Sequence, residues 1–154
     1  MKKVLLVVPL ILVLLLLGLF AWKTYETHEF SAFIKAYEAQ VVPIWKEASI
    51  AYFEATISGK EEDYKKSEEL QIKLTKIWSN KQEFAKLKKW KESRLITNPL
   101  LKRQLQVIFN SYLANQVDEK KLEEMVRRQT EIEKKFNTYR AQVGGKTIDR
   151  KSVV

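Results

Sequence analysis

The residues that could perform metal chemistry lie around the only histidine of the chain, His28. The segment His28-Glu29-Phe30-Ser31-Ala32 begins like the His-Glu-x-x-His signature, in which two histidines one helical turn apart bind zinc and the glutamate activates water. Ala32 occupies the place of the second histidine. Because one imidazole cannot supply the usual ligand set of a catalytic zinc ion, we expect no catalytic, metal-binding or cofactor-binding residue in this chain.

Adjacent carboxylates are the other candidates, since two carboxyl groups in one site can divide the acid and base roles. Here each group lies on a predicted amphipathic helix that also carries lysines. We therefore interpret them as parts of a solvated helix face rather than as a site. The groups are Glu61-Glu62-Asp63, Glu68-Glu69 and Glu123-Glu124.

One segment, Lys81–Arg103, is strongly basic and has Phe84 and Trp90 between its cations. Such a surface could contact phosphates or anionic lipid headgroups, and the alternative is again a solvated helix face. Nucleic acid is not an expected partner, because the N-terminal segment predicts an extracytoplasmic location for the rest of the chain. The basic residues are Lys81, Lys86, Lys88, Lys89, Lys91, Arg94, Lys102 and Arg103, with Glu83 and Glu92 as the acidic residues among them.

The composition indicates an α-helical protein with one domain. The chain has 154 residues, of which 31% are charged, and it contains 4 glycines and 3 prolines. Few turn-forming residues and many charged ones favour helices over a turn-rich β fold, so we predict an all-α fold. The net charge of +9 suits an anionic partner, and the absence of cysteine excludes disulfides and thiolate metal sites.

The N-terminal segment has the apolar character expected of a membrane-spanning helix. The stretch Val4–Trp22 contains no charged residue and, as a helix, would be roughly 28 Å long, close to the thickness of the hydrocarbon core of a bilayer. Lys2 and Lys3 would keep the N-terminus in the cytoplasm. We therefore predict a signal-anchor transmembrane helix over residues 1–22 and a single-pass protein of the cell membrane whose remaining domain is extracytoplasmic.

A cleaved signal peptide is the alternative interpretation of the same segment, and it would give a secreted or periplasmic protein. The candidate cleavage site, Leu19-Phe20-Ala21, has a large residue where a small one is preferred. We therefore favour the uncleaved anchor, which makes the membrane the expected partner of the N-terminal helix.

The rest of the chain, residues 23–148, predicts about five amphipathic helices, and the first of them, His28–Gly59, organises the others. Its apolar residues recur at spacings of three and four, which gathers them on one wide face that is rich in aromatic rings. Pro43 predicts a kink near residues 39–42 rather than a break. The residues of this face are Phe30, Phe33, Ile34, Tyr37, Val41, Ile44, Trp45, Ala48, Ala51, Tyr52 and Ala55.

Start and stop signals divide the remaining residues into further helices. The second helix follows over Lys60–Ser79. Asn80, the pair Asn98-Pro99 and Asp118 are N-cap signals for the next three, and Gly144-Gly145 ends the helical pattern. The expected core residues of these helices are Tyr64, Leu70, Leu74, Ile77, Trp78, Phe84, Leu87, Trp90, Leu101, Leu105, Ile108, Phe109, Tyr112, Leu113, Leu122, Met125, Val126, Ile132, Phe136 and Tyr139.

Segments throughout the helical region also carry a family resemblance. They are Phe33–Glu38, Trp45–Phe53, Ala55–Gly59, Gly59–Lys66, Asp118–Leu122 and Ile132–Arg140. Together they resemble the N-terminal helices of the peptidyl-dipeptidase A family, the zinc metallopeptidases that include angiotensin-converting enzyme. The similarity extends over His28–Ile148, and it consists of helix-packing motifs rather than catalytic ones.

The resemblance implies that the chain is a fragment of a larger all-α peptidase fold. In that family the N-terminal helices form a lid over a deep cleft that restricts the substrate, and the zinc-binding signature lies far downstream. Zinc as a cofactor and a peptide as a substrate are therefore expected only in an intact family member. No residue of this chain matches a ligand or catalytic position of the family.

The leading hypothesis is that the chain is the lid segment of an extracytoplasmic zinc peptidyl-dipeptidase, cut off before the active site and itself not catalytic. Residues 149–154 correspond to codons that a common sequencing adapter encodes in one frame, so we expect a non-native tail and a gene that continues past Ile148. The alternative is a complete, membrane-anchored helical module that binds a partner. Exposed apolar faces separate the two hypotheses, because a severed lid leaves faces uncovered that a self-sufficient module covers.

Overall fold

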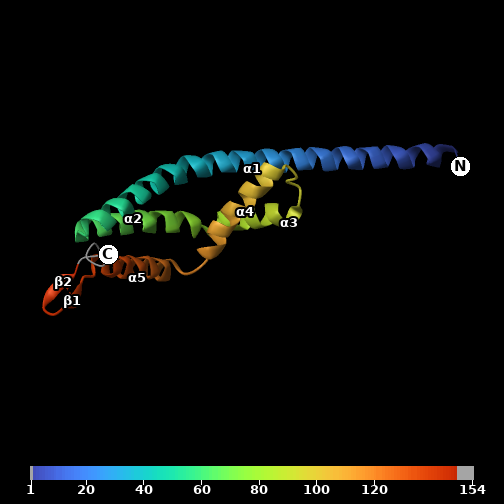
Figure 1. Cartoon of the computed structure of the whole chain (residues 1–154). Helices are drawn as coiled ribbons and strands as arrows, with labels where there is room; N and C mark the ends of the chain where they lie inside the picture. Colours follow the sequence, from blue (N-terminus) through green and yellow to red (C-terminus); the bar gives the residue numbers. More distant parts are fainter. Residues whose placement is uncertain (1, 149–154) are drawn as a thin grey trace. The chain divides into compact units, whose positions relative to one another are not determined.

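The computed structural model describes the backbone of residues 2–148 and the side chains from Ile11 onward. The predicted tail, 149–154, lies outside the described residues. The all-helical prediction is confirmed for the body of the chain, and a short hairpin follows the last helix. The elements are α1 Lys2–Ser58, α2 Glu61–Trp78, α3 Lys81–Ser93, α4 Pro99–Ala114, α5 Glu119–Thr138, β1 Ala141–Val143 and β2 Lys146–Ile148 (Figure 1).

The structure corrects the prediction of a transmembrane helix over residues 1–22. In the part of the chain that the structure describes, no helix is both long and apolar enough to cross a membrane. Residues 4–10 lie outside the described side chains. The helix does not end after Trp22 but continues to Ser58, so the prediction of a separate transmembrane helix over residues 1–22 is wrong.

The helix boundaries follow the capping signals of the sequence. Asn80, Asn98 and Asp118 each accept hydrogen bonds from backbone N–H groups two or three residues further on, at 2.9–3.3 Å. Pro99 occupies the start of α4, where its missing N–H group costs nothing. Gly59, with a φ of 66°, ends α1 in the left-handed conformation. The predicted starts of α3, α4 and α5 are therefore confirmed, whereas the last helix ends at Thr138 and not at the predicted Gly144-Gly145.

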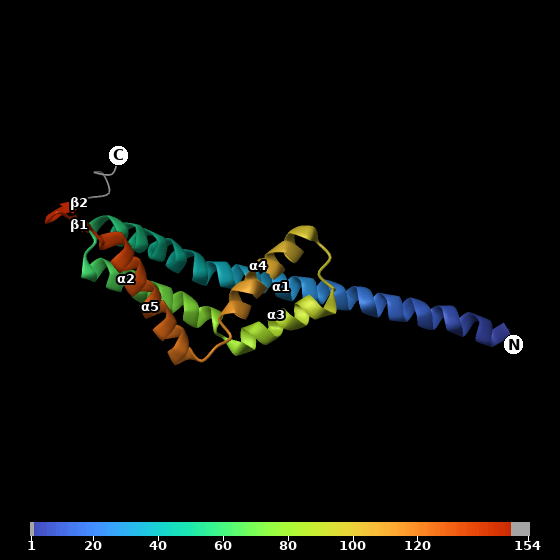
Figure 2. The ribbon, with the colours of Figure 1, turned by 60° about the horizontal axis from the view of Figure 1, so that its bottom comes forward.

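Contacts between the elements divide the described chain into two compact units, and α1 takes part in both. Unit 1 contains α1 as far as Gln40, together with α3 and α4. Unit 2 contains α1 from Val41, together with α2, α5 and the two strands. Within unit 1, α3 lies beside α4, and within unit 2, α2 lies beside α5 (Figures 1 and 2). As predicted, Pro43 does not break α1.

Aromatic rings form the core of unit 1. The ring centres of Phe30 and Phe33 on α1 lie 5.2 and 5.4 Å from that of Trp90 on α3. Tyr37, also on α1, lies 6.2 Å from Tyr112 on α4. Tilted pairs at these distances are favourable beyond the area that they bury. The aromatic residues predicted from the helical spacing thus join all three helices of the unit.

Beside these rings lies a buried carboxylate, Glu26, whose side chain is only 3% exposed. It accepts hydrogen bonds from Nε1 of Trp90 at 2.8 Å and from Nζ of Lys89 at 2.9 Å. A buried charge is tolerated when it is paired and hydrogen-bonded, as it is here. The apolar periodicity of α1 gave no indication of this residue.

A second polar contact in unit 1 joins α4 to α3. The hydroxyl of Tyr112, which is fully buried, donates a hydrogen bond to Oε2 of Glu83. Burial raises the pKa of the Tyr112 phenol well above its ordinary value, and the hydrogen bond to Glu83 and the charge of Glu83 raise it further. Glu83 thus serves tertiary packing through its side chain, in addition to supplying a backbone N–H group to the Asn80 cap.

Unit 2 is packed with smaller residues. Ala48, Ala51 and Ala55 of α1 are each at most 1% exposed, and α2 contributes Tyr64, Leu70 and Leu74 to the core. Of α5, only Leu122 is buried. Small side chains let a helix backbone approach its neighbours closely. The buried side chains of unit 2 therefore come mainly from α1 and α2, and α5 packs along α2 with Leu122 as its one buried side chain and a hydrogen bond from Asn137 to the hydroxyl of Tyr64.

The hairpin that follows α5 was not predicted. Its strands pair antiparallel, with Ala141 opposite Ile148 and Val143 opposite Lys146. Gly144 and Gly145 form the two-residue turn with φ values of 57° and 76°, which is the conformation of a type I′ turn. A Gly-Gly pair is a signal for a hairpin turn as well as for the end of a helical pattern.

The contacts of Glu26 predict the effect of its removal. Glu26→Ala leaves the indole N–H group of Trp90 without its acceptor, so the free energy of unfolding should fall by about 2 to 4 kcal/mol in urea denaturation. Glu29→Ala, an exposed neighbour on the same helix, is the control and should change it by less than about 0.5 kcal/mol. Equal decreases in the free energy of unfolding of the two variants would show that the buried carboxylate of Glu26 does not stabilise the fold.

The raised pKa of Tyr112 predicts a loss of stability in alkali. The unfolded chain ionises this tyrosine above about pH 10 while the folded chain keeps the proton, so its contribution is present below that pH and declines above it. Near pH 11 the loss due to this residue should be about 1.4 kcal/mol, and Tyr112→Phe should lack it. Tyr139→Phe, at an exposed tyrosine, should keep the pH dependence of the parent chain; an unchanged curve in Tyr112→Phe would contradict the assignment.

Candidate functional site

The structure gives His28 no metal-binding neighbours. The side chain is exposed on α1. Across residues 11–148, the structure brings no three histidine, cysteine, aspartate or glutamate side chains together in a way that could hold a metal ion. The charged and apolar surfaces of the described residues are therefore the candidates for a functional site.

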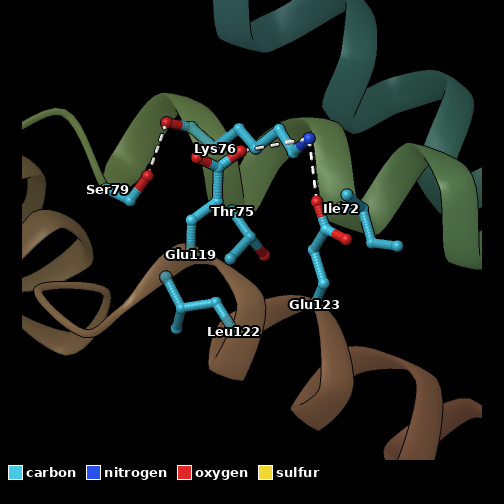
Figure 3. Close-up of a pocket in the computed structure, with 7 residues that line it drawn as sticks. All are labelled: Ile72, Thr75, Lys76, Ser79, Glu119, Leu122 and Glu123. Atoms are coloured by element: carbon cyan, nitrogen blue, oxygen red, sulfur yellow. Dashed lines mark hydrogen bonds and ion pairs between the residues drawn. The ribbon is translucent and has the colours of Figure 1, made fainter.

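The carboxylates at the start of α5 bind a lysine of α2 (Figure 3). Lys76 lies between Glu119 and Glu123, with its Nζ 3.1 Å from one carboxylate and 2.9 Å from the other. The hydrogen bond from Lys76 lowers the pKa of Glu123, and the bonds to Glu123 and then Glu119 raise the pKa of Lys76. Leu122 lies below this cluster and is the buried residue of α5. These carboxylates join two helices.

The other predicted carboxylate groups are used in the same way. Glu68 of α2 pairs with Arg127 of α5 at 3.5 Å, and Glu61 pairs with Lys134. Glu124 pairs with Arg128 within α5. These ion pairs stabilise unit 2, which agrees with the interpretation as a charged helix face.

The predicted basic segment separates into two groups. Lys88 pairs with Glu92 at 3.9 Å, and Lys89 pairs with the buried Glu26 at 2.9 Å. These lysines therefore contribute to the structure of unit 1. The cations that share a pocket are Lys91, Arg94 and Lys102.

The largest departure from the predicted packing lies on α1 in unit 2. The aromatic face predicted from the helical spacing is only partly covered, since Trp45 is 59% exposed and Tyr52 is 40% exposed. Val42, Phe53 and Ile57 are exposed as well. Val42, Phe53 and Ile57 lie on the side of α1 away from its buried alanines, and Trp45 lies at the edge of that side, one turn before Ala48. We call Val42, Trp45, Phe53 and Ile57 the α1 stripe.

The apolar residues of α5 are also largely uncovered. Met125 and Ile132 are 61% and 67% exposed, although both were expected in the core. Within unit 2, α5 packs along α2 with Leu122 as its one buried side chain, and Met125 and Ile132 lie outside this contact. We call Met125 and Ile132 the α5 stripe.

Comparison with known proteins identifies no relative. No protein-family model, no curated protein and no solved structure matches the chain. The resemblance to the peptidyl-dipeptidase A family therefore stays a prediction, and the function has to be argued from the surfaces described above.

A first functional prediction concerns catalysis. The purified chain should not cleave a blocked tripeptide, with or without added zinc, because its one histidine cannot complete a catalytic zinc site. The measurement is product formation by liquid chromatography, with an intact peptidyl-dipeptidase as the positive control. Zinc-dependent cleavage that a chelator abolishes would contradict the prediction.

Proposed function

We propose that this chain is a helical binding module that docks onto a partner protein through the α1 stripe. The observation that carries the proposal is the arrangement of α1 in unit 2, which buries alanines and exposes Trp45, Phe53 and Ile57. An amphipathic helix usually turns its large apolar residues toward the core. The reverse arrangement is typical of a helix whose large side chains serve a second surface.

The size of these side chains makes the α1 stripe suited to binding. A buried aromatic side chain removes about 150 to 250 Å² from water, and apolar area contributes roughly 25 cal/mol per Å². Trp45 and Phe53 alone could therefore contribute several kcal/mol before the entropic costs of association. Tryptophan is also the residue type most often found to dominate binding energy at protein interfaces.

The spacing of the stripe indicates the kind of partner. Trp45, Phe53 and Ile57 project from one side of a helix at intervals of four residues or a multiple of four, with the small Ser49 between the first two. A helix of this kind binds by laying its apolar residues into a groove, such as the groove between two helices. We therefore propose an apolar, helix-lined surface as the partner, and the α5 stripe provides a second anchor on the same unit.

The family resemblance makes this proposal more specific. If the chain is the lid segment of a zinc peptidyl-dipeptidase, the groove belongs to the catalytic body of that enzyme, which would also hold the zinc and the peptide. The resembling segments support this form of the proposal. The exposed stripe supports it as well, because a severed lid leaves apolar faces uncovered that a self-sufficient module covers.

An interaction experiment tests the proposal. The full chain should bind the separately produced catalytic body of a bacterial peptidyl-dipeptidase A, and Trp45→Lys with Phe53→Lys should weaken the binding about a hundredfold in calorimetric titration. Leu113→Lys is the control, because Leu113 is similarly exposed but lies on α4 in unit 1. This variant should bind within about twofold of the parent chain.

The outcomes separate the general proposal from its specific form. Binding that is lost in the double variant and kept in the control supports the lid. If the catalytic body is not bound but the parent chain self-associates in sedimentation, and the double variant does not, the chain is a binding module without the peptidase. If the double variant behaves like the parent chain in both measurements, the α1 stripe is not a docking surface.

A further inference from the structure

A separate feature of unit 1 is a pocket between the end of α3 and the first turns of α4. Its volume is about 590 Å³, which falls in the size range of small-molecule sites. It is lined by charged, polar and apolar side chains from α3, the connection 94–98 and α4. The lining residues are Trp90, Lys91, Arg94, Ile96, Thr97, Lys102, Leu105 and Gln106.

The charged side chains that line this pocket are all positive. Lys91, Arg94 and Lys102 contribute three cations, and none of the described residues that line the pocket is acidic. The acidic residues nearest in sequence are used elsewhere, since Glu92 pairs with Lys88 and Glu83 accepts a hydrogen bond from the hydroxyl of Tyr112. The three cations therefore face the pocket without a carboxylate to neutralise them, which favours an anion.

The backbone at Arg94 points to a use for its side chain. Arg94 ends α3 with a φ of 56°, and among the described residues it is the only one other than glycine with a positive φ. Glycine is the usual residue at such a position because a side chain there is strained. An arginine in a conformation that favours glycine, with its side chain at a pocket, indicates a functional reason for the side chain.

The other lining residues indicate which chemical group accompanies the anion in the ligand. Trp90, Ile96 and Leu105 are each nearly buried and form an apolar floor. Lys91 is held at the rim, with its Nζ 3.9 Å from the centre of the Phe109 ring. Thr97 and Gln106 add hydroxyl and amide groups that can donate hydrogen bonds.

We infer that this pocket binds a phosphate monoester attached to an apolar group. Arginine binds phosphate oxygens through two parallel N–H groups, and two lysines supply the charge that balances a phosphate dianion. The apolar floor accommodates the group that carries the phosphate. The inference is independent of the docking surface proposed above, because the pocket and the α1 stripe belong to different units.

Calorimetric titration of the full chain with phenyl phosphate tests the inference. Lys102→Gln and Arg94→Gly should each weaken the binding about tenfold or more. Arg103→Gln is the matched control, since Arg103 is the next residue on α4 but does not line the pocket, and it should change the affinity less than about twofold. Arg94→Gly relaxes the backbone, so it should melt no lower than the parent chain, and a loss of binding there cannot be attributed to unfolding.

Two further probes identify the source of the phosphate. Inorganic phosphate should bind at least about tenfold more weakly than phenyl phosphate, because it makes no contact with the floor. Vesicles of phosphatidic acid in phosphatidylcholine provide the lipid source. Binding to phenyl phosphate supports a soluble ligand, and Lys102-dependent binding to these vesicles alone supports a lipid headgroup.

Three results would overturn the inference. Equal effects of Lys102→Gln and Arg103→Gln would show attraction to positive charge in general. Equal affinities for inorganic and phenyl phosphate would show that the apolar floor takes no part. No measurable binding to phenyl phosphate or to the vesicles would show that the pocket is not a phosphate site.

Discussion

The buried carboxylate of Glu26 is the interaction on which unit 1 depends. It joins α1 to α3 by accepting hydrogen bonds from Trp90 and Lys89. The hydrogen bond to the indole N–H group fixes the orientation of the Trp90 ring. This ring also contacts Phe30 and Phe33 in the core and lines the pocket between α3 and α4. A buried polar network of this kind specifies one arrangement of the surrounding rings, because any other arrangement of the rings would leave the buried carboxylate of Glu26 without its partners.

The same helix is used in two different ways along its length. In unit 1, α1 packs aromatic residues inward and the unit closes around them. In unit 2, it packs Ala48, Ala51 and Ala55 inward and leaves Trp45 and Phe53 in solvent. Exposed rings of this size weaken the solubility of a chain unless they are covered. The proposed docking function would cover Trp45 and Phe53, which take no part in the core of unit 2.

Unit 2 also shows why a partner could change its stability. The fifth helix is attached through Leu122 and through ion pairs such as those of Lys76 with Glu119 and Glu123. Ion pairs between exposed side chains contribute little, typically less than about 1 kcal/mol each. A helix held in this way opens at a low free-energy cost, and a ligand that covers its apolar residues would stabilise it by mass action.

The sequence by itself determined the helical class, the starts of α3, α4 and α5 and most of the core, because caps such as Asn80 and Asn98 act within a few residues and periodicity marks a buried face such as Phe30, Ile34 and Val41. Tertiary structure decided the burial of Glu26, the pocket around Arg94 and the exposure of Trp45. Local spacing cannot supply these facts: α1 is apolar on more than one side, and which side is covered depends on residues distant in the sequence that pack against it.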